Sequence, residues 1–422
     1  MQITTEKLII NYYSDVDACL HRVSHMLHIN ESDLLTYAEG SWPNITKINW
    51  RAGPLRSEVL QNFPNLIELD CFLNHLESLH GIEVCVNLER LYCHSNYLTT
   101  LQGIEACPKL TSLKCESNHL ATLFVGAEFS NLTELKCSNN RLTTLCGLEQ
   151  FPNLETLNCS WNGLATLTSP DQLDLLLDTT HISIELEPTG ITCCPGLVNL
   201  SCGNNRLHSL KGIEACLNLT HLTVEGNQLR ELSDLCSSSQ LTYLDCFRNQ
   251  LTTLKGIEAC GQLEYLLCGE NKLESLAGIQ FCPKLFTIRC DDSGLSSLDC
   301  GAVCPSIRAI HCGSNRINTL SDLQSYPKLL ELYCWKNQLT SLSGIELCPK
   351  LVRFNCDDNC LTSLTDLKPC YRLHELSFQN NLVTDLNGIE RCIGLRELDC
   401  IGNPIQSLEP LMPVLPRETQ LC

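Results

Sequence analysis

The fold is decided by residues 241–284, which read LTYLDCFRNQLTTLKGIEACGQ followed by LEYLLCGENKLESLAGIQFCPK. Both segments are 22 residues long and carry leucine at positions 1, 4, 11 and 14, cysteine at position 6 and asparagine at position 9. A 22-residue unit cannot bury its own leucines, so neighbouring units must share one hydrophobic core. The stretch therefore predicts a stack of repeated coils in which each coil covers the next.

The same pattern extends along most of the chain. It occurs in sixteen copies, the first beginning at Leu66 and the last at Leu395, and thirteen of the fifteen steps between copies are 22 residues. An imperfect unit over residues 45–55 precedes the first copy. We therefore expect residues 45–422 to form a solenoid of about 16–17 repeats.

Two parts of the chain depart from the pattern. The copy at Leu173 is flanked by steps of 19 and 24 residues, and Asp178 and His181 take its cysteine and asparagine positions. We expect an irregular repeat at residues 168–196, which is a bulge, a hinge or a contact. Residues 1–44 lie outside the repeats, and their apolar residues at helical spacing predict an N-terminal helical cap on the first coil.

The repeat resembles the leucine-rich repeat family, specifically a cysteine-rich 22-residue class that includes phosphatase-regulator and bacterial internalin repeats. The resemblance covers roughly residues 45–411 and rests on sixteen copies in register. It implies an α/β fold class: a curved, horseshoe-shaped solenoid with a parallel β-sheet on the concave face. The segments after position 14 are short, mostly Gly-Ile or Asp-Leu, and predict turns or 3₁₀ segments on the convex face.

The asparagines and cysteines of the repeat have a structural interpretation. Asparagine occupies position 9 in fourteen of the sixteen copies, where a buried amide can bond the turn backbone of adjacent coils. Of 30 cysteines, thirteen occupy position 6 and nine occupy position 20, which we expect to face the core. Stacked strands hold parallel side chains ~4.8 Å apart, so a ladder of disulfides would be strained. We expect free thiols in a reducing compartment.

A structural zinc site is the competing interpretation for some of the cysteines. The candidate ligands are Cys300, Cys304, His311 and Cys312 in one group, and the vicinal Cys193 and Cys194 in another. Strand residues alternate between faces, so His311 should point away from Cys312, and the set contains no CxxC pair. We therefore expect no bound metal and no cofactor.

A map of the concave face follows from strand geometry. Side chains alternate along a strand, so positions 4 and 6 point into the core while positions 3, 5 and 7 point into the concavity. Exposed aromatic and arginine side chains are typical of binding hot spots. They concentrate in the copies from Leu241 to Leu351, with a smaller group at Phe72, Tyr92 and His94. The predicted partner-binding residues are Tyr243, Phe247, Tyr265, Arg289, His311, Tyr333, Trp335 and Asp357.

Charge and composition restrict the class of partner. With 29 basic and 48 acidic residues, the formal charge of −19 repels nucleic-acid phosphates and anionic lipid headgroups. No segment reads as a membrane span or as a common signal peptide. Around the aromatic copies, seven basic and eight acidic residues give a mixed rim that suits a protein partner. We expect a monomer in the cytoplasm, or in the host cytosol if a specialised machinery secretes it, that binds neither nucleic acid nor membrane.

No enzyme motif accompanies the repeats. The sequence lacks GxxxxGK[ST], GxSxG and HExxH, and we predict no catalytic residue. The leading interpretation is a non-enzymatic scaffold that binds a protein through its concave face. A host-directed effector and a phosphatase-regulator-like adaptor are alternatives suggested by the resemblance. A ubiquitin-ligase-type enzyme is a further alternative, but in such proteins the catalytic cysteine lies in an additional large domain, which we do not expect here.

Overall fold

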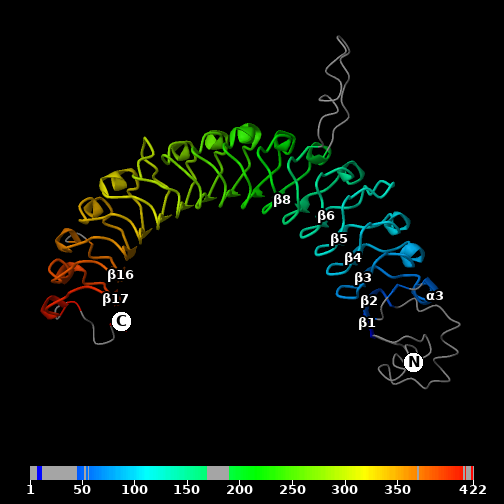
Figure 1. The fold of residues 1–422 in the computed structure, drawn as a ribbon, viewed down its shortest axis with the longest axis horizontal. Coiled ribbons are helices and arrows are strands. Elements are labelled where there is room, and N and C mark those ends of the chain that lie inside the picture. Colours follow the sequence, from blue (N-terminus) through cyan, green and yellow to red (C-terminus); the bar gives the residue numbers. More distant parts are fainter. Residues whose placement is uncertain are drawn as a thin grey trace, which may run out of the picture. The chain divides into compact units, whose positions relative to one another are not determined.

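The computed structural model describes residues 7–11, 45–51, 54–55, 57–168, 190–367, 370–411, 414 and 420–421. The chain forms two compact units, Met1–Leu219 (unit 1) and Thr220–Cys422 (unit 2). Within each unit the strands lie on the inner side of the stacked coils and the short 3₁₀ turns on the outer side (Figure 1). This arrangement is the leucine-rich repeat solenoid that the sequence predicts.

Unit 1 is a parallel sheet in which each described strand pairs with the next in sequence order. Its strands are β1 Lys7–Asn11, β2 Lys47–Arg51, β3 Glu68–Asp70, β4 Arg90–Tyr92, β5 Ser112–Lys114, β6 Glu134–Lys136, β7 Thr156–Asn158 and β8 Asn199–Ser201. Its helical turns are α3 Ser57–Leu60 and the 3₁₀ segments η1 Ile82–Val84, η2 Ile104–Ala106, η3 Leu148–Gln150, η5 Gly190–Cys193 and η6 Ile213–Ala215.

Unit 2 repeats the same plan, again with parallel pairing in sequence order. Its strands are β9 His221–Thr223, β10 Tyr243–Asp245, β11 Tyr265–Leu267, β12 Thr287–Arg289, β13 Ala309–His311, β14 Glu331–Tyr333, β15 Arg353–Asn355, β16 Glu375–Ser377, β17 Glu397–Asp399 and β18 Gln420–Leu421. Its 3₁₀ segments are η7 Ser233–Ser237, η8 Ile257–Ala259, η9 Ile279–Phe281, η10 Ser321–Ser325, η11 Ile345–Leu347, η12 Thr365–Leu367, η13 Ile389–Arg391 and η14 Glu409–Leu411.

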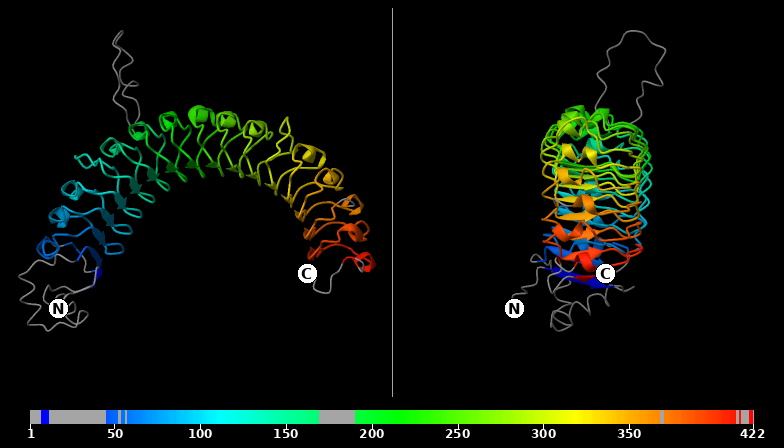
Figure 2. Two further views of the ribbon diagram at one scale, coloured as in Figure 1. Left: turned by 180° about the vertical axis from the view of Figure 1, so that it is seen from behind. Right: turned by 90° about the vertical axis from the view of Figure 1, so that its left-hand side faces the viewer.

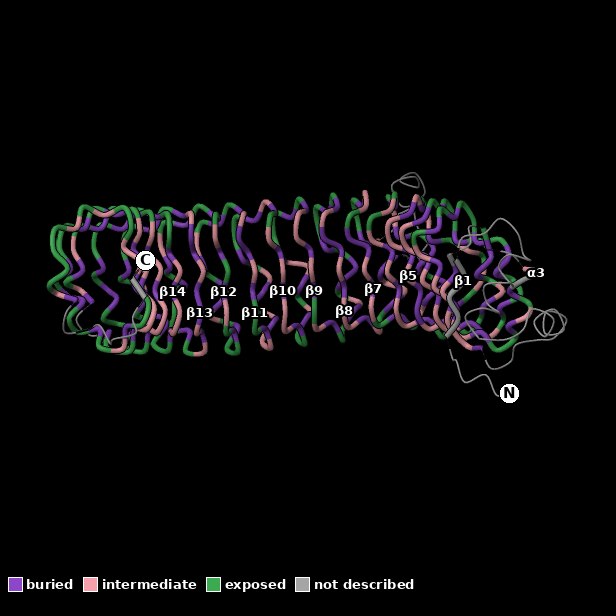
Figure 3. The backbone as a smooth tube through the Cα atoms, turned by 90° about the horizontal axis from the view of Figure 1, so that it is seen from below, coloured by how far each residue is buried: buried purple, intermediate pink, exposed green. Residues whose placement is uncertain are grey.

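The parallel register places equivalent repeat positions side by side. Leu244 of β10 pairs with Leu266 of β11, 22 residues later, and the pairing continues to Ile288 of β12. The end-on view shows the strands of unit 2 stacked over one another (Figure 2). In β3 to β17 the middle residue is buried, while the residues on either side of it keep some exposure in most strands, so buried and exposed segments alternate along the coils (Figure 3). Repeat positions 3, 5 and 7 therefore form continuous columns on the concave side.

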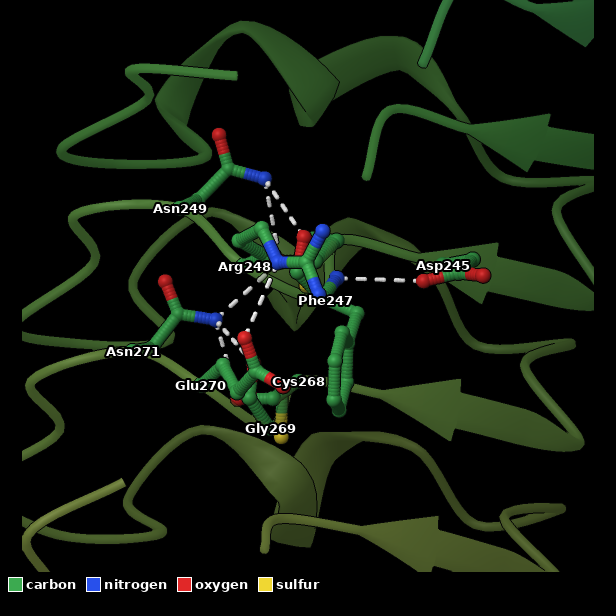
Figure 4. A network of polar contacts seen from close by, with 9 residues as sticks. Asp245, Phe247, Arg248, Asn249, Cys268, Gly269, Glu270 and Asn271 are labelled. Carbon is green, nitrogen blue, oxygen red and sulfur yellow. Dashed lines mark hydrogen bonds and ion pairs between the residues drawn. The ribbon is translucent and has the colours of Figure 1, made fainter. Parts of the chain in front are cut away.

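The asparagine at position 9 links adjacent coils, as predicted. The Nδ2 group of Asn271 donates to the carbonyl oxygens of Cys246 and Cys268 at 3.1 and 3.0 Å, and its Oδ1 accepts from the Leu251 amide at 3.0 Å. Asn249 makes the same donor contacts one coil earlier (Figure 4). These amides satisfy turn backbone groups that would otherwise be buried without partners, which would cost free energy.

In many coils a Gly-Ile-Glu sequence on the convex side forms the outer turn. Gly256 precedes η8 with a φ of 112°, a left-handed conformation that glycine adopts without strain. A Cβ there would overlap the Leu232 carbonyl group of the preceding coil. Its N–H donates to the Glu258 carboxylate at 2.5 Å. The glutamate two residues after the glycine thus caps the outer turn, and Glu214 and Glu346 make the same contact in other coils.

The N-terminal part and the irregular repeat are only partly described. β1 lies within residues 1–44, where we predicted no strand, and it pairs with β2. The helices predicted at 15–29 and 32–38 fall outside the described residues. The copy at Leu173 also falls outside them. Within the described part, no helix is long and apolar enough to cross a membrane.

Candidate protein-binding surface

All eight predicted partner-binding residues lie in unit 2, on or directly after strands β10–β15. Five of them are aromatic side chains at repeat positions 3, 5 and 7, which we call the concave aromatic cluster: Tyr243, Phe247, Tyr265, Tyr333 and Trp335. Tyr265 is 42% exposed and Trp335 is 37% exposed. Rings of this size that remain accessible on a sheet face are typical of contact surfaces.

The position-3 aromatics form a ladder across neighbouring strands. The ring centroids of His221 and Tyr243 lie 5.9 Å apart, and those of Tyr243 and Tyr265 lie 6.5 Å apart. Phe286, at position 2 of the next copy, extends the ladder with a centroid 6.4 Å from that of Tyr265. Parallel pairing in register brings the rings together because equivalent positions stack, so the ladder is a preformed apolar strip.

The Phe247 ring packs against the next coil, which has glycine at the same position. A Cβ on Gly269 would come within 2.6 Å of Phe247 Cε2, so any larger residue there would displace the ring (Figure 4). The Phe247 amide donates to Asp245 Oδ1 at 3.0 Å, which fixes the backbone beneath the ring. Sequence reasoning identified Phe247 but not the glycine that shapes its seat.

A second aromatic group forms around β13 and β14. His311 stacks on Tyr333 with centroids 4.4 Å apart and an interplanar angle of 13°. Trp335 follows β14 and covers Gly313 of the preceding coil, where a Cβ would overlap the indole. Phe247 therefore leans toward the following coil and Trp335 toward the preceding one.

Arg289 and Asp291 lie on the strand and turn between the two aromatic groups. Arg289 Nε is 3.8 Å from Asp291 Oδ2, and Asp291 Oδ1 accepts from the Gly313 amide at 2.8 Å. The Arg289 charge also acts on Tyr243 and on His311. The structure therefore places Arg289 between the two aromatic groups. Direct ring contacts occur within each group: one group joins His221, Tyr243, Tyr265 and Phe286, and the other joins His311 and Tyr333.

Partial burial shifts the pKa values of the stacked pair Tyr333 and His311. Burial raises the pKa of Tyr333, and the adjacent Glu331 raises it further. Burial, together with the nearby Arg289 charge, lowers the pKa of His311. Near neutral pH the His311 ring is therefore uncharged and Tyr333 is protonated, so the stacked pair presents an uncharged surface with polar edges.

Charged residues surround a shallow cavity beyond Tyr333. Arg353 donates from Nη1 to Glu331 Oε1 at 2.7 Å and from Nε to Glu375 Oε2 at 2.8 Å, bridging strands β14 and β16. A cavity of about 270 Å³ opens here. Its polar lining is Tyr333, Arg353, Asn355, Glu375, Ser377, Glu397 and Asp399.

Asp357 makes hydrogen bonds within its own coil and to the next coil. Its Oδ1 accepts from Ser377 Oγ and from the Gln379 amide, both at 2.6 Å, and its Oδ2 accepts from Asn355 Nδ2 at 2.8 Å. These bonds hold the neighbouring coil in place. The partner-binding assignments of all eight residues, Asp357 included, stay predictions.

Unit 1 carries aromatic contacts of its own, some of which sequence reasoning missed. Phe72 stacks on His94 with centroids 4.8 Å apart, and the Lys114 ammonium lies 4.6 Å from the centre of the Tyr92 ring. A further ladder occupies repeat position 10, a column that strand alternation does not assign to the concave face. It consists of His75, Tyr97 and His119, with successive centroids 5.3 and 5.8 Å apart.

The zinc interpretation finds no cluster to support it. Among the described residues, no three His, Cys, Asp or Glu side chains converge as metal ligands. Cys300 and Cys304 do meet, with sulfurs 3.4 Å apart, but Cys312 points into the core and His311 stacks on Tyr333 on the concave face. The alternation of strand faces separates them, for the reason that the sequence suggested.

Comparisons with known proteins agree with this geometry. A family model described as leucine-rich repeats (2 copies) matches residues 327–369. A comparison of the sequence with curated proteins found no match.

Among solved structures, a leucine-rich repeat protein of Leptospira interrogans is 22% identical, with a TM-score of 0.67 over 98% of this chain and 99% of that one. YopM from Yersinia enterocolitica is 24% identical, with a TM-score of 0.56 over 90% and 87%. The functional domain of InlJ from Listeria monocytogenes, which includes a cysteine ladder, is 26% identical, with a TM-score of 0.51 over 78% and 75%. The stacked 22-residue coils and these matches show that the chain has the leucine-rich repeat solenoid fold, and the family model matches two copies of the repeat within it.

Proposed function

We propose that the protein is a non-enzymatic interaction scaffold that binds a protein partner through the concave face of unit 2. The observation that carries the proposal is the concave aromatic cluster. Its rings are held by stacking and by glycine seats, so they lose little side-chain entropy when a partner covers them. Preorganised aromatic anchors of this kind dominate the binding energy of protein interfaces.

Charge on the same face favours a basic partner surface. Positions 3, 5 and 7 of the nine copies from Leu219 to Leu395 hold two arginines, Arg289 and Arg353, and eight acidic residues. Glu375 and Glu397 stand side by side in the strand register, a like-charge arrangement that a cation from a partner would relieve. The acidic residues are Glu225, Asp245, Asp291, Glu331, Asp357, Glu375, Glu397 and Asp399.

The wider setting follows from the same features. Leucine-rich repeat proteins include receptors such as Toll, solved in complex with Spatzle, which illustrates how this fold can hold a protein. We place the scaffold in the cytoplasm, or in the host cytosol if it is a secreted effector, because the cysteines among the described residues are free thiols, which suit a reducing compartment. We expect it to act as a monomer, and an adaptor role of the phosphatase-regulator kind remains the alternative.

The test compares partner capture by three forms of the full chain. Wild type, Tyr333→Ala plus Trp335→Ala, and the control Trp161→Ala are used as baits in a lysate, after circular dichroism has shown that all three fold. Trp161 is 61% exposed but lies in unit 1, so it controls for the loss of an exposed indole. The proposal predicts a protein retained by wild type and by Trp161→Ala and lost by the double variant. Equal retention by all three forms would show that the binding site lies elsewhere.

The proposal that the partner presents a basic surface has a separate test. The captured protein is purified and its affinity measured by calorimetry for wild type and for Glu375→Lys plus Glu397→Lys at low and high salt. We expect at least a tenfold loss of affinity on charge reversal and a weakening of wild-type binding with salt. A partner that binds the charge-reversed variant as tightly as wild type would contradict it.

A further inference from the structure

Two cysteines meet on the convex side of unit 2, away from the proposed interface. Cys300 and Cys304 lie between β12 and β13, with their sulfurs 3.4 Å apart. Most coils have a 3₁₀ segment at this point, whereas the described structure has none between these two strands. Here the chain loops out, so Gly301, Ala302 and Val303 are exposed while both cysteines are buried.

The repeat pattern explains why this pair forms. Cys304 is the ordinary position-20 cysteine, equivalent to Cys260 and Cys282. Cys300 occupies position 16, where the other coils mostly have the glycine or aspartate that starts the outer turn. An unusual cysteine is therefore brought against a standard one by the fold itself.

The surroundings of Cys300 differ from those of the other core cysteines. The hydrogen bond with Cys304 lowers the pKa of Cys300, against the opposing effect of burial, while the same contact raises the pKa of Cys304. By contrast, burial raises the pKa of Cys282 to about 12. Because the thiolate is the reactive form, the contact makes Cys300 the more easily ionised and therefore the more reactive sulfur of the pair.

We propose that Cys300 and Cys304 form a redox-active dithiol that hydroperoxides oxidise to an intramolecular disulfide. The Cys300 thiolate attacks one peroxide oxygen; the O–O bond breaks, and the leaving hydroxide takes the proton released by the thiol and becomes water. Cys304 then attacks the resulting Cys300 sulfenic acid, forming the S–S bond and releasing a second water. One hydrogen peroxide is reduced to two waters and two thiols are oxidised.

The local structure permits this closure. The sulfurs must approach from 3.4 Å to about 2.05 Å. The exposed segment can accommodate that movement, because Gly301 has a φ of 79° with open space around it and no regular turn constrains the loop. A small peroxide suits the site better than a bulky disulfide, because both sulfurs are largely buried.

Peptide mapping of the full chain tests the proposal. Reduced protein is treated with one equivalent of hydrogen peroxide, alkylated after denaturation and digested with trypsin, which releases residues 290–308 with Cys290, Cys300 and Cys304. We expect only Cys290 to be alkylated in this peptide, and the peptide mass to be two hydrogens below that of the same peptide with Cys300 and Cys304 as free thiols. Dithiothreitol should reverse the change. Equal oxidation of cysteines across the chain, or a disulfide elsewhere, would overturn the proposal.

Matched variants separate chemistry from folding. With one equivalent of hydrogen peroxide, wild type should lose two alkylatable thiols. Cys300→Ser should abolish this loss, while Cys282→Ser, which removes an ordinary position-20 thiol in the preceding coil, should leave it unchanged. If Cys300→Ser fails to fold, the peptide map of the wild-type protein is sufficient to test the proposal. Early oxidation that persists in folded Cys300→Ser would also contradict the assignment.

Discussion

The indole of Trp335 covers Gly313, the residue at the equivalent position of the preceding coil. The Gly313 amide donates to Asp291 Oδ1 at 2.8 Å, so the glycine is tied to the coil before it as well. A single absent side chain thus decides where the largest ring of the concave aromatic cluster lies.

Gly313→Ala should displace the Trp335 ring. The added methyl group overlaps the indole, so the ring must rotate into solvent. We expect increased acrylamide quenching of tryptophan fluorescence and a loss of partner affinity of about tenfold, comparable with loss of a hot-spot contact. Gly261→Ala is the control, because a Cβ at Gly261 meets nothing within 4 Å. Unchanged quenching in Gly313→Ala would show that the ring is not seated on the glycine.

Asn271→Ala should destabilise unit 2. The substitution leaves the Leu251 amide without its acceptor, and it removes one of two side-chain donors from each of the Cys246 and Cys268 carbonyl oxygens, which keep Asn249 and Ser293. An unsatisfied buried amide costs about 1–3 kcal/mol and each lost hydrogen bond about 1 kcal/mol, so we expect a total loss of about 3 kcal/mol in the free energy of unfolding. Urea denaturation measures it, with the exposed Asn387→Ala as the control, expected to change stability by less than about 0.5 kcal/mol. Similar effects for both variants would refute the proposed role of the asparagine ladder.

Ser293→Asn should stabilise the chain. Ser293 occupies position 9, and its hydroxyl donates to the Cys268 carbonyl oxygen at 3.2 Å. Within the described residues, the Leu273 amide makes no hydrogen bond to this side chain. In other coils the asparagine Oδ1 accepts from that amide position, as Asn271 does from Leu251. Restoring the bond should add about 1 kcal/mol, seen as a higher urea midpoint. A lower midpoint would mean that this coil cannot accommodate the larger side chain.

Stability should fall at alkaline pH. Burial raises the pKa of core thiols such as Cys260 and Cys282 from 9.0 to about 12. Their contribution to stability is complete below pH 9 and is lost as the pH rises from 9 to about 12, because the unfolded chain ionises first. The urea midpoint should therefore decrease between about pH 8 and about pH 10.5. A constant midpoint would indicate that the cysteines are oxidised or not buried.

Thiol titration should distinguish native from denatured protein. Cys146, Cys236 and Cys360 are exposed, whereas most other described cysteines are buried. In native protein we expect these three to react quickly with a bulky thiol reagent, and close to thirty thiols to react after denaturation without reductant. Far fewer than thirty would mean that the chain contains disulfides and would argue against a reducing compartment.

Much of the fold was predictable because one short pattern repeats. The 22-residue spacing fixes the strand at positions 3–5, and strand alternation then assigns Tyr243 to the concave face and Leu244 to the core, as the structure has them. Position 9 asparagines and position 6 cysteines follow from the same alternation and from the need to satisfy the turn backbone.

Contacts between coils were harder to predict. The seats of Phe247 and Trp335 depend on which way each ring leans, and that is set by a glycine 22 residues later in one case and earlier in the other. The Asp357 network and the Cys300–Cys304 contact arise from departures from the repeat, for which a consensus pattern has no information. Strand β1 has no leucine pattern of its own and was missed for that reason.

The central claim is that the concave face of unit 2 holds the partner. Hydroxyl-radical footprinting of the complex with the captured protein tests it most directly, because it reports the accessibility of each ring without a substitution. We predict reduced oxidation of Trp335, Tyr333 and Tyr265 in the complex, with Trp161 and Tyr97 of unit 1 unchanged. Unchanged oxidation of Trp335 together with protection of Tyr97 or Trp161 would contradict the claim.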